Sequence, residues 1–284
     1  MTRVLITGSE GFISSHLKEL LPSADCVDIK LGQDIRNSTW YDFQEPHDII
    51  YHLAANASIP QSLKNPLESH TSNVDGTLRV LEYAKKTGAR VVFSSSSSVY
   101  GEPSEIPTTE KAEPRPMMPY ALQKLMCEQY MALYWGLYGV KSIALRYMNV
   151  FGERQEQANG GGDSALALGN FLRQYKNGEP FTVVGDGEQR RDFVYAGDVA
   201  MANLLAGNWL KTAKRFEVFN IGSGENYSIN EVCDMIDKNH PRVNLPPRIE
   251  PHIGLADITK AKRLLGWEPR VRLKEWLTEA VKTR

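Results

Sequence analysis

Tyr120 and Lys124 are the two residues of this sequence whose types and spacing most clearly suggest chemistry. They stand four residues apart in the segment PYALQK (119–124), so on a helix they share one face. An ammonium group within a few ångströms of a phenol favours the phenolate, which can act as a general base near neutral pH. The spacing alone also fits a solvated lysine beside a half-buried tyrosine. The rest of the chain must show which of the two interpretations holds.

Length and charge bound the class of protein. The chain has 284 residues, enough for one large domain or two smaller ones that share an interface. Its 33 Lys and Arg residues balance 34 Asp and Glu, so charge does not predict binding to nucleic acid or to an anionic membrane. No run approaches the ~18 apolar residues of a membrane span, and the N-terminus lacks the regions of a cleavable signal.

The cysteines and histidines do not suggest a metal site. The three cysteines stand far apart, and the six histidines are scattered without the spacing of metal ligands. An odd number of cysteines fits a reducing compartment. We therefore expect a cytoplasmic protein without a bound metal, in which His52 is a packed residue at a strand end.

The N-terminal segment predicts a strand, a glycine-bearing turn and a helix. Residues 3–7 (RVLIT) form a short run rich in β-branched residues, Gly8 and Gly11 follow, and helix-compatible residues continue over 15–21. Such a turn lets a pyrophosphate approach the backbone, and the N–H groups at the helix N-terminus can bind it. The third glycine-type position is Ser14, which is also small. We favour a dinucleotide-binding turn over a plain strand–helix connection.

Asp28 indicates which dinucleotide the turn would bind. It ends the second predicted strand, ~20 residues beyond the glycine turn, where a carboxylate accepts both ribose hydroxyls of NAD and repels the 2′-phosphate of NADP. Lys30 stands close by in the sequence. NAD is therefore the favoured cofactor, and NADP stays open as the alternative.

Strands alternate with helices along the first half of the chain. Residues 33–36 predict a strand end before a helical stretch, and 48–55 (DIIYHLAA) predict a buried strand that closes on small residues. Residues 67–86 have the apolar spacing of a long helix, whereas 90–93 (RVVF) and 141–147 (KSIALRY) predict further strands. The alternation predicts a doubly wound α/β fold with a parallel sheet.

Five consecutive serines follow the strand at 90–93. Ser94 to Ser98 stand between the apolar segments VVF and VYG, whereas a flexible serine linker is expected among polar residues. Hydroxyl groups at the carboxyl end of a strand lie on the sheet edge that also carries the nucleotide turn. They are placed to hydrogen-bond a reacting carbonyl or hydroxyl group.

Taken together, these segments resemble the extended short-chain dehydrogenase/reductase family, in particular its NAD-dependent nucleotide-sugar epimerase branch. The matching segments follow the family's order over nearly the whole chain, which is far more specific than any one of them. They are TGSEGFI (7–13), DIR (34–36), HLAA (52–55), NVDGT (73–77), SSSSSVYG (94–101), Tyr120 with Lys124, RYMNVFG (146–152), GDG (185–187) with RDFV (191–194), and LGW (265–267).

The resemblance implies roles for individual residues. It implies that Ser96, Tyr120 and Lys124 are catalytic and that Lys124 also holds the nicotinamide ribose. The residues implied to bind NAD are Gly8, Gly11, Phe12, Ile13, Asp28, Asp34, Ile35, Leu53, Ala54, Ala55, Asn73, Ser94, Tyr120, Lys124, Tyr147 and Val150. The residues implied to bind the substrate are Ser96, Ser97, Asn149, Arg191, Arg248 and Gly254.

Two differences from the patterns of related enzymes limit which reaction and which sugar the resemblance implies. Dehydratases of the family have Asp-Glu directly after the catalytic hydroxyl, whereas Ser97 and Ser98 follow Ser96 here, so we do not expect elimination of water. Gly254 stands where related 4-epimerases limit the room around C2 of the sugar. Because glycine has no side chain, we expect an N-acetylated hexosamine to fit.

The resemblance also implies two domains. Residues 1–150 and 192–222 would form a Rossmann domain that binds NAD, and residues 151–191 and 223–284 a smaller α/β domain that binds the nucleotide sugar. The segment 153–163, which contains three consecutive glycines, is either a lid over the nucleotide or an exposed loop. Apolar residues on the helices at 67–86 and after Tyr120 are more than one sheet face needs, so they predict a homodimer unless they belong to the ordinary core.

The implied activity is that of an NAD-dependent 4-epimerase of a UDP-sugar, either UDP-glucose/galactose or UDP-GlcNAc/GalNAc, acting through a transient 4-keto intermediate. Within the family, the alternatives are a UDP-glucuronate epimerase or decarboxylase and a nucleotide-sugar reductase. An alternative of another class is a non-catalytic NAD-binding regulatory protein. Such proteins usually lose the tyrosine or the lysine, and both are present here.

Overall fold

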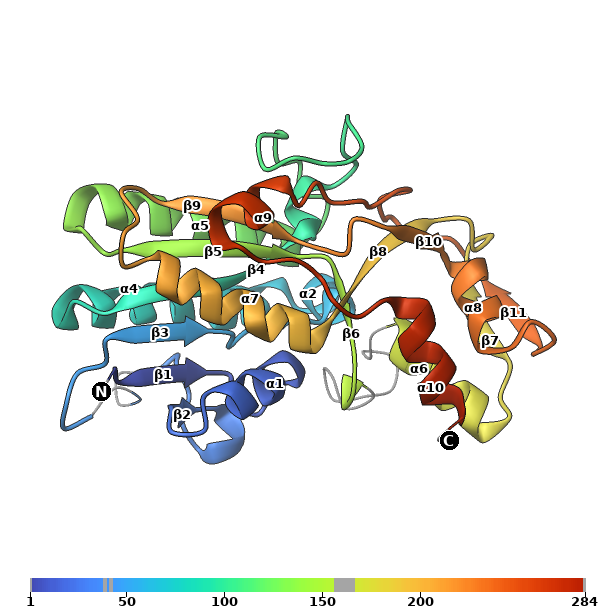
Figure 1. The fold of residues 1–284 in the computed structure, drawn as a ribbon, viewed down its shortest axis with the longest axis horizontal. Helices are drawn as coiled ribbons and strands as arrows, with labels where there is room; N and C mark the ends of the chain where they lie inside the picture. Colours follow the sequence, from blue (N-terminus) through green and yellow to red (C-terminus); the bar gives the residue numbers. More distant parts are fainter. Residues whose placement is uncertain (1, 38–39, 41–42, 156–166, 283–284) are drawn as a thin grey trace.

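A parallel sheet of six strands forms the centre of the protein, in the order β2-β1-β3-β4-β5-β9 (Figure 1). The structure is a computed structural model that describes residues 2–37, 40, 43–155 and 167–282. The strands are β1 Val4–Thr7, β2 Asp25–Val27, β3 Ile49–His52, β4 Arg90–Ser96, β5 Ser142–Tyr147 and β9 Glu217–Ile221. Every neighbouring pair is parallel, which confirms the predicted doubly wound α/β fold.

The central sheet sends alternate side chains into two hydrophobic cores. Ile6 and Ile49 face one core, whereas Leu5 and Ile50 face the other. The helices over the first core are α1 Phe12–Leu20, α7 Ala196–Trp209 and α9 Thr259–Leu265, and those over the second are α4 Gly76–Thr87 and α5 Pro119–Tyr138 (Figure 1). Burial on both faces explains why the strands are almost continuously apolar in sequence.

The long helix predicted over 67–86 is present but interrupted. Helix α3 Pro66–His70, which follows α2 Ile59–Lys64, is joined to α4 by a π-helical turn at Thr71–Asp75. A π turn changes the direction of the side chains around it and is frequent at functional sites. In this one, Asn73 is buried and its side chain points to residues of other elements, as described below.

The prediction of a strand end at 33–36 is wrong. The carboxylate of Asp34 accepts a hydrogen bond from the Arg36 N–H at 2.9 Å and binds its guanidinium at 2.6 Å, so the segment folds into a turn. No helix forms in the described part of 37–47, where one was expected. In the common order 3-2-1-4-5-6 a further strand lies outside the second strand. Among the described residues no strand pairs there, so β2 is the edge of the sheet.

The C-terminal half adds a smaller α/β lobe, at the right of Figure 1. One sheet consists of β6 Asn149–Phe151, β8 Arg190–Tyr195 and β10 Asn226–Ser228, and β7 Phe181–Val184 pairs with β11 Arg242–Leu245. The helices are α6 Ala167–Asn177, α8 Ile229–Asp237 and α10 Leu273–Lys282. A separate core that includes Phe151, Phe181 and Phe193 holds this lobe together. Most of the predicted lid at 153–163 lies outside the described residues.

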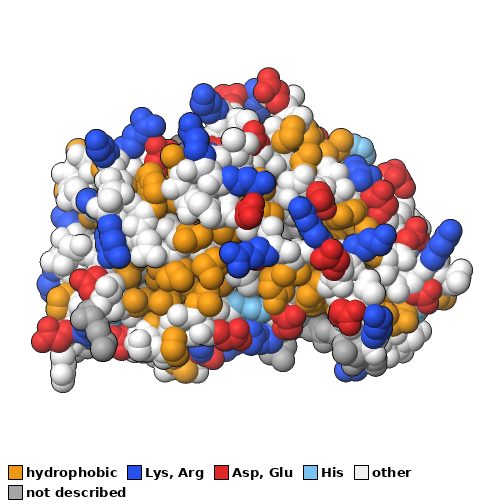
Figure 2. All heavy atoms as spheres, in the orientation of Figure 1, with side chains coloured by type: hydrophobic (Ala, Val, Ile, Leu, Met, Phe, Trp, Pro, Cys, Tyr) orange, Lys and Arg blue, Asp and Glu red, His pale blue; other side chains and the backbone are white. Residues whose placement is uncertain are grey.

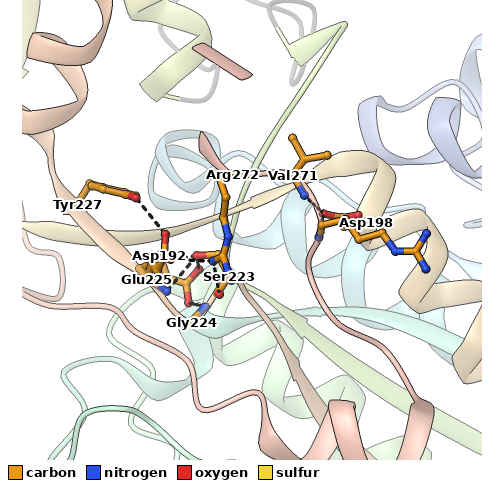
Figure 3. Close-up of polar contacts among 9 residues, drawn as sticks. Asp192, Asp198, Ser223, Gly224, Glu225, Tyr227, Val271 and Arg272 are labelled. Carbon is orange, nitrogen blue, oxygen red and sulfur yellow. Dashed lines mark hydrogen bonds and ion pairs between the residues drawn. The ribbon is translucent and has the colours of Figure 1, made fainter. Parts of the chain in front are cut away.

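Two buried carboxylates connect the smaller lobe with the larger one (Figure 3). Asp192 accepts hydrogen bonds from the N–H and hydroxyl groups of Ser223 at 2.6 and 2.8 Å and from the N–H of Ala256 at 3.1 Å. Asp198, in the first turn of α7, accepts from the N–H of Val271 at 3.0 Å. Each carboxylate therefore holds a loop of the C-terminal part against the body of the protein.

The surface in Figure 2 carries no large area of one charge. Hydrophobic side chains gather over α7, and acidic and basic side chains are interspersed around them. Within the described ranges, every helix is too short or too polar to cross a membrane.

His52 is a buried polar residue at the end of β3. Its Nδ1 lies 2.7 Å from the Thr7 hydroxyl and its Nε2 lies 2.9 Å from the Thr77 hydroxyl. Because Thr77 donates its own proton to the Asn73 carbonyl at 2.6 Å, His52 donates from Nε2 and accepts at Nδ1. Burial, with the positive charge of Lys124, lowers the pKa of His52 to about 3. The imidazole is therefore a neutral bridge between β1 and α4.

We predict that His52 makes the protein less stable in mild acid. Since the pKa in the unfolded chain is near 6.5, the folded state binds fewer protons than the unfolded state between about pH 6 and pH 4. The free energy of unfolding should fall by about 1.4 kcal/mol per pH unit in this window because of His52. Urea unfolding should show a shallower pH dependence for His52→Gln. His70→Gln, at a half-exposed histidine, should keep the wild-type slope, and equal slopes for both variants would contradict the assignment.

Candidate active site

The glycine turn lies directly against the end of β3. Gly8 has φ of +70°, a left-handed conformation that favours glycine, and a Cβ atom there would lie 2.6 Å from the Ala54 Cα. Helix α1 begins at Phe12 after Gly11, which has no capping side chain. The N–H groups of the first turn, including those of Phe12 and Ile13, therefore have no intrahelical acceptor and form the type of anion site predicted from the sequence.

Asp28 lies beside this turn, as the sequence predicted. Its carboxylate accepts hydrogen bonds from the backbone N–H groups of Glu10 at 2.9 Å and Lys30 at 2.8 Å. Glu10 forms an ion pair with Lys18 at 2.6 Å, and the Lys30 ammonium lies 3.4 Å from the Glu10 carbonyl. The side of the turn that is predicted to face the ribose therefore combines two carboxylates with two ammonium groups, and backbone N–H groups hold Asp28 in place.

Tyr120 and Lys124 lie on the buried face of α5. Their exposed fractions are 9% and 3%, which excludes the alternative of a solvated lysine. The Lys124 ammonium donates to the Ser94 carbonyl at 2.6 Å and lies 5.8 Å from the centre of the Tyr120 ring. Burial lowers the pKa of Lys124 to about 8.

Ser96 joins this pair at the end of β4. A side-chain hydrogen bond connects Ser96 with Tyr120 and favours the phenolate, but burial dominates and raises the pKa of Tyr120 to about 12. The expected lowering of this pKa by Lys124 is therefore absent, and the ammonium is bound to the Ser94 carbonyl instead. The structure brings Ser96, Tyr120 and Lys124 together and leaves the phenol protonated.

A buried ion pair next to these residues was not found from the sequence. Glu128, one helical turn after Lys124, binds the Arg146 guanidinium through two bonds of 2.9 and 2.6 Å, and both side chains are 5% exposed. The Ser95 hydroxyl donates to the same carboxylate at 2.5 Å. The four-residue spacing after Tyr120 and Lys124 was the available signal, since it places Glu128 on the same face of the helix.

Asn73 connects two segments that border the site. Its amide nitrogen donates to the Asn56 carbonyl at 3.1 Å and to Gln123 Oε1 at 2.8 Å, and its oxygen accepts from the Asn56 N–H at 2.7 Å. Gln123 in turn donates to the Ser69 hydroxyl at 2.9 Å. Both amide protons of Asn73 are thus engaged, so its side chain positions the loop after β3 and the start of α5.

The other predicted cofactor residues lie around the same sheet edge. Leu53, Ala54 and Ala55 follow β3 directly. The Tyr147 hydroxyl accepts from Ser94 Oγ at 3.0 Å and donates to Asn203 Oδ1 at 2.9 Å, which fixes the end of β5. The remaining positions are Asp34 and Ile35 in the turn before β3, with Ile35 packed against α4, and Val150 in β6.

The predicted substrate residues fall into two groups. Arg191 binds Glu250 at 2.8 Å, and the Gly254 N–H donates to the Arg190 carbonyl at 2.9 Å, so the segment around 250–254 lies along β8. Ser97 and Asn149 lie near the ends of β4 and β5. Arg248 is exposed and takes no part in the contacts with β8. Glu250 is a residue that the sequence did not reveal, because its partner stands 59 positions away.

Comparison with known proteins agrees with this geometry. The sequence model described as the NAD dependent epimerase/dehydratase family matches residues 4–222. The chain belongs to the NAD dependent epimerase/dehydratase family. As an epimerase/dehydratase family member it is an NAD-dependent enzyme, as the glycine turn and the Tyr120–Lys124 pair predicted.

Members of this epimerase/dehydratase family resemble the chain over its full length. The UDP-glucose 4-epimerase of Mycolicibacterium smegmatis is 32% identical, over 98% of this chain and 97% of the relative. The UDP-glucuronic acid decarboxylase 1 of Danio rerio is 33% identical, over 98% of this chain and 72% of the relative. The structure of the UDP-N-acetylglucosamine 4-epimerase from Methanobrevibacter ruminantium M1, in complex with UDP-N-acetylmuramic acid, superimposes with a TM-score of 0.86, at 31% identity over 99% of this chain and 97% of that one.

We predict that the Glu128–Arg146 pair is a strong determinant of stability. Glu128→Gln leaves the buried guanidinium without its counter-charge and should lower the free energy of unfolding by about 3–5 kcal/mol. The double variant Glu128→Leu/Arg146→Met removes both charges and should recover most of that loss. Urea unfolding of Glu128→Leu, Arg146→Met and the double variant measures the coupling.

The control for this measurement is Arg115→Ala, which breaks an ion pair whose side chains are 66% and 75% exposed. It should cost less than about 1 kcal/mol. A cost of that size for Glu128→Gln as well would show that the buried pair contributes no more than a surface pair.

Proposed function

We propose that the protein is an NAD-dependent 4-epimerase of a UDP-sugar, either UDP-glucose/galactose or UDP-GlcNAc/GalNAc. The observation that carries the proposal is the group formed by the half-buried Ser96 with the buried Tyr120 and Lys124, in a chain whose glycine turn follows β1 of the same sheet. Both a UDP-glucose 4-epimerase and a UDP-N-acetylglucosamine 4-epimerase resemble the chain over nearly its whole length, which supports this substrate class.

The site residues divide the chemistry between them. Tyr120 takes the proton of the C4 hydroxyl and later returns it, and Ser96 hydrogen-bonds the C4 oxygen. Bound NAD would accept the hydride from C4 and give it back to the opposite face of the 4-keto sugar. Because burial raises the pKa of Tyr120, loss of its proton would depend on the hydrogen bond from Ser96 and on the positive charge that an oxidised nicotinamide would add to the site.

A 4-keto sugar must rotate about its link to the diphosphate before it can be reduced on its other face. The site must therefore hold the nucleotide more firmly than the sugar. We assign Asn149 and Arg191 to the diphosphate, since an arginine suits that oxygen cluster, and we retain Arg248 as a second arginine. At Gly254 a Cβ atom would lie 3.6 Å from the Met148 side chain. The absence of a larger side chain there supports room for an N-acetyl group.

The same assignment divides the chain into two functional parts. Residues 1–150 and 192–222 bind NAD, and 151–191 and 223–284 bind the nucleotide sugar. The described cysteines are all free thiols, which supports a reducing, cytoplasmic compartment.

Tyr120→Phe should abolish epimerisation and leave NAD binding intact, because the hydroxyl carries the proton while the ring keeps its packing. The wild-type protein is incubated with UDP-glucose, UDP-GlcNAc or UDP-glucuronate, and the products are identified by NMR. The NAD released on denaturation is quantified for both proteins. We expect a 4-epimer with the wild type and an equal NAD content in the variant.

Three results would contradict this assignment. Full activity in Tyr120→Phe would remove the tyrosine from the mechanism. A pentose product from UDP-glucuronate would indicate the decarboxylase that the Danio rerio relative represents. Reduction of the sugar with stoichiometric release of oxidised cofactor would indicate a reductase.

We further propose that the enzyme is a homodimer that pairs through α5. Leu122, Leu133 and Leu137 are 48%, 50% and 62% exposed, and with the partly buried Met126 and Tyr130 they recur every three or four residues. This stripe lies on the side of α5 away from the sheet, and a stripe of this spacing typically packs against another apolar surface.

Leu133→Asp should convert the dimer to a monomer, because a carboxylate in the apolar contact cannot be solvated. Sedimentation velocity measures the change, and Leu63→Asp, at an exposed leucine on α2, is the matched control. A monomeric wild type, or a dimer that survives Leu133→Asp, would rule out this interface.

A further inference from the structure

Ser98 lies two residues after the catalytic Ser96, in the 3₁₀ turn Ser97–Tyr100 that follows β4. The Ser98 hydroxyl donates a hydrogen bond to Ser96 Oγ at 2.9 Å. The backbone N–H of Ser98 donates to the same oxygen at 3.2 Å. Ser98 is half-buried.

The two bonds from Ser98 restrict what Ser96 can do. A serine hydroxyl has two acceptor lone pairs and one proton. Since Ser98 occupies both lone pairs, Ser96 is left with its proton alone and can act only as a donor. Tyr120 is a hydrogen-bond partner of Ser96, and the bond favours the phenolate.

Buried anchors on both sides hold this arrangement in place. Before Ser96, the Ser95 hydroxyl is bound to the Glu128 carboxylate at 2.5 Å. After Ser98, Tyr100 is buried, donates to Asn220 Oδ1 at 2.7 Å and stacks on the Arg146 guanidinium at 4.6 Å. The backbone between these anchors has little freedom, so the Ser98 hydroxyl is preorganised against Ser96.

We propose that Ser98 is a positioning residue that makes Ser96 an obligate hydrogen-bond donor, whose single proton is offered either to Tyr120 or to the reacting C4 oxygen. The inference rests on the proposed function and specifies how the Ser96 hydroxyl takes part in it. A ketone at C4 only accepts hydrogen bonds, so a Ser96 that is free to turn its lone pairs toward C4 would stabilise the keto sugar less. A phenolate likewise only accepts, and it loses the same donor.

Removal of the Ser98 hydroxyl should therefore slow the reaction without weakening binding. For Ser98→Ala we expect kcat to fall about 3- to 10-fold, the equivalent of one net hydrogen bond, while KM for the UDP-sugar and the NAD content stay within about twofold. Ser98→Thr keeps a hydroxyl group and should restore most of kcat. Ser104→Ala, at an exposed serine in the following loop, is the matched control and should behave as wild type.

A second readout separates positioning from a purely structural role. Ultraviolet difference titration of the NAD-bound protein, with Tyr120→Phe as the reference, follows ionisation of Tyr120 alone. Loss of the oriented donor should raise the pKa of Tyr120 in Ser98→Ala by about half a unit or more. Circular dichroism and thermal unfolding verify that the variant is folded.

The outcomes distinguish this inference from the proposed function. Unchanged kcat and an unchanged Tyr120 titration in Ser98→Ala would overturn it. A raised KM with normal kcat would also overturn it, because Ser98 would then contact the substrate itself. If the wild type epimerises none of the three sugars, the proposed function fails, but the titration still tests the link from Ser98 to Tyr120.

Discussion

The buried ion pair between Glu128 and Arg146 joins α5, which carries Tyr120 and Lys124, to the central sheet, and the geometry of the candidate site depends on it. Tyr120, Lys124 and Glu128 stand at four-residue intervals on α5, so a bond that fixes Glu128 also fixes the direction of the other two. Because both charged groups are enclosed, neither can be solvated elsewhere without a large loss of free energy. The same carboxylate accepts a hydrogen bond from the Ser95 hydroxyl, which fixes the position of α5 relative to β4 next to Ser96.

Polar side chains near the carboxyl ends of the central strands are likewise fixed by hydrogen bonds to neighbouring elements. His52 bridges β1 and α4, and Asn73 bridges the loop after β3 and α5. Asp28 is held by the backbone N–H groups of Glu10 and Lys30. Buried polar groups that are fully satisfied are rigid, because any other arrangement leaves a donor or acceptor unpaired. The edge that receives the dinucleotide is therefore preorganised, so little has to be ordered on binding.

Burial acts in opposite directions on the two titratable groups of the site. It raises the pKa of Tyr120 to about 12 and lowers that of Lys124 to about 8, since it disfavours the charged form of each. The ammonium alone does not produce a phenolate in such surroundings. A cationic nicotinamide would add positive charge that favours release of the tyrosine proton, so the chemistry would be linked to occupation of the site.

The sequence by itself determined the features that depend on neighbouring residues in the chain. The order of strands and helices, the glycine turn with Asp28, the serine run and the Tyr120–Lys124 pair follow from periodicity, spacing and ordered motifs, which express local geometry. The tertiary structure decided which distant side chains meet, such as Arg191 with Glu250. It also decided that 33–36 is a turn, because the Asp34 carboxylate satisfied the local backbone where no neighbouring strand did. The pKa of Tyr120 also depends on the tertiary structure. Desolvation raises it, and desolvation depends on every element packed around the phenol rather than on the lysine four residues away.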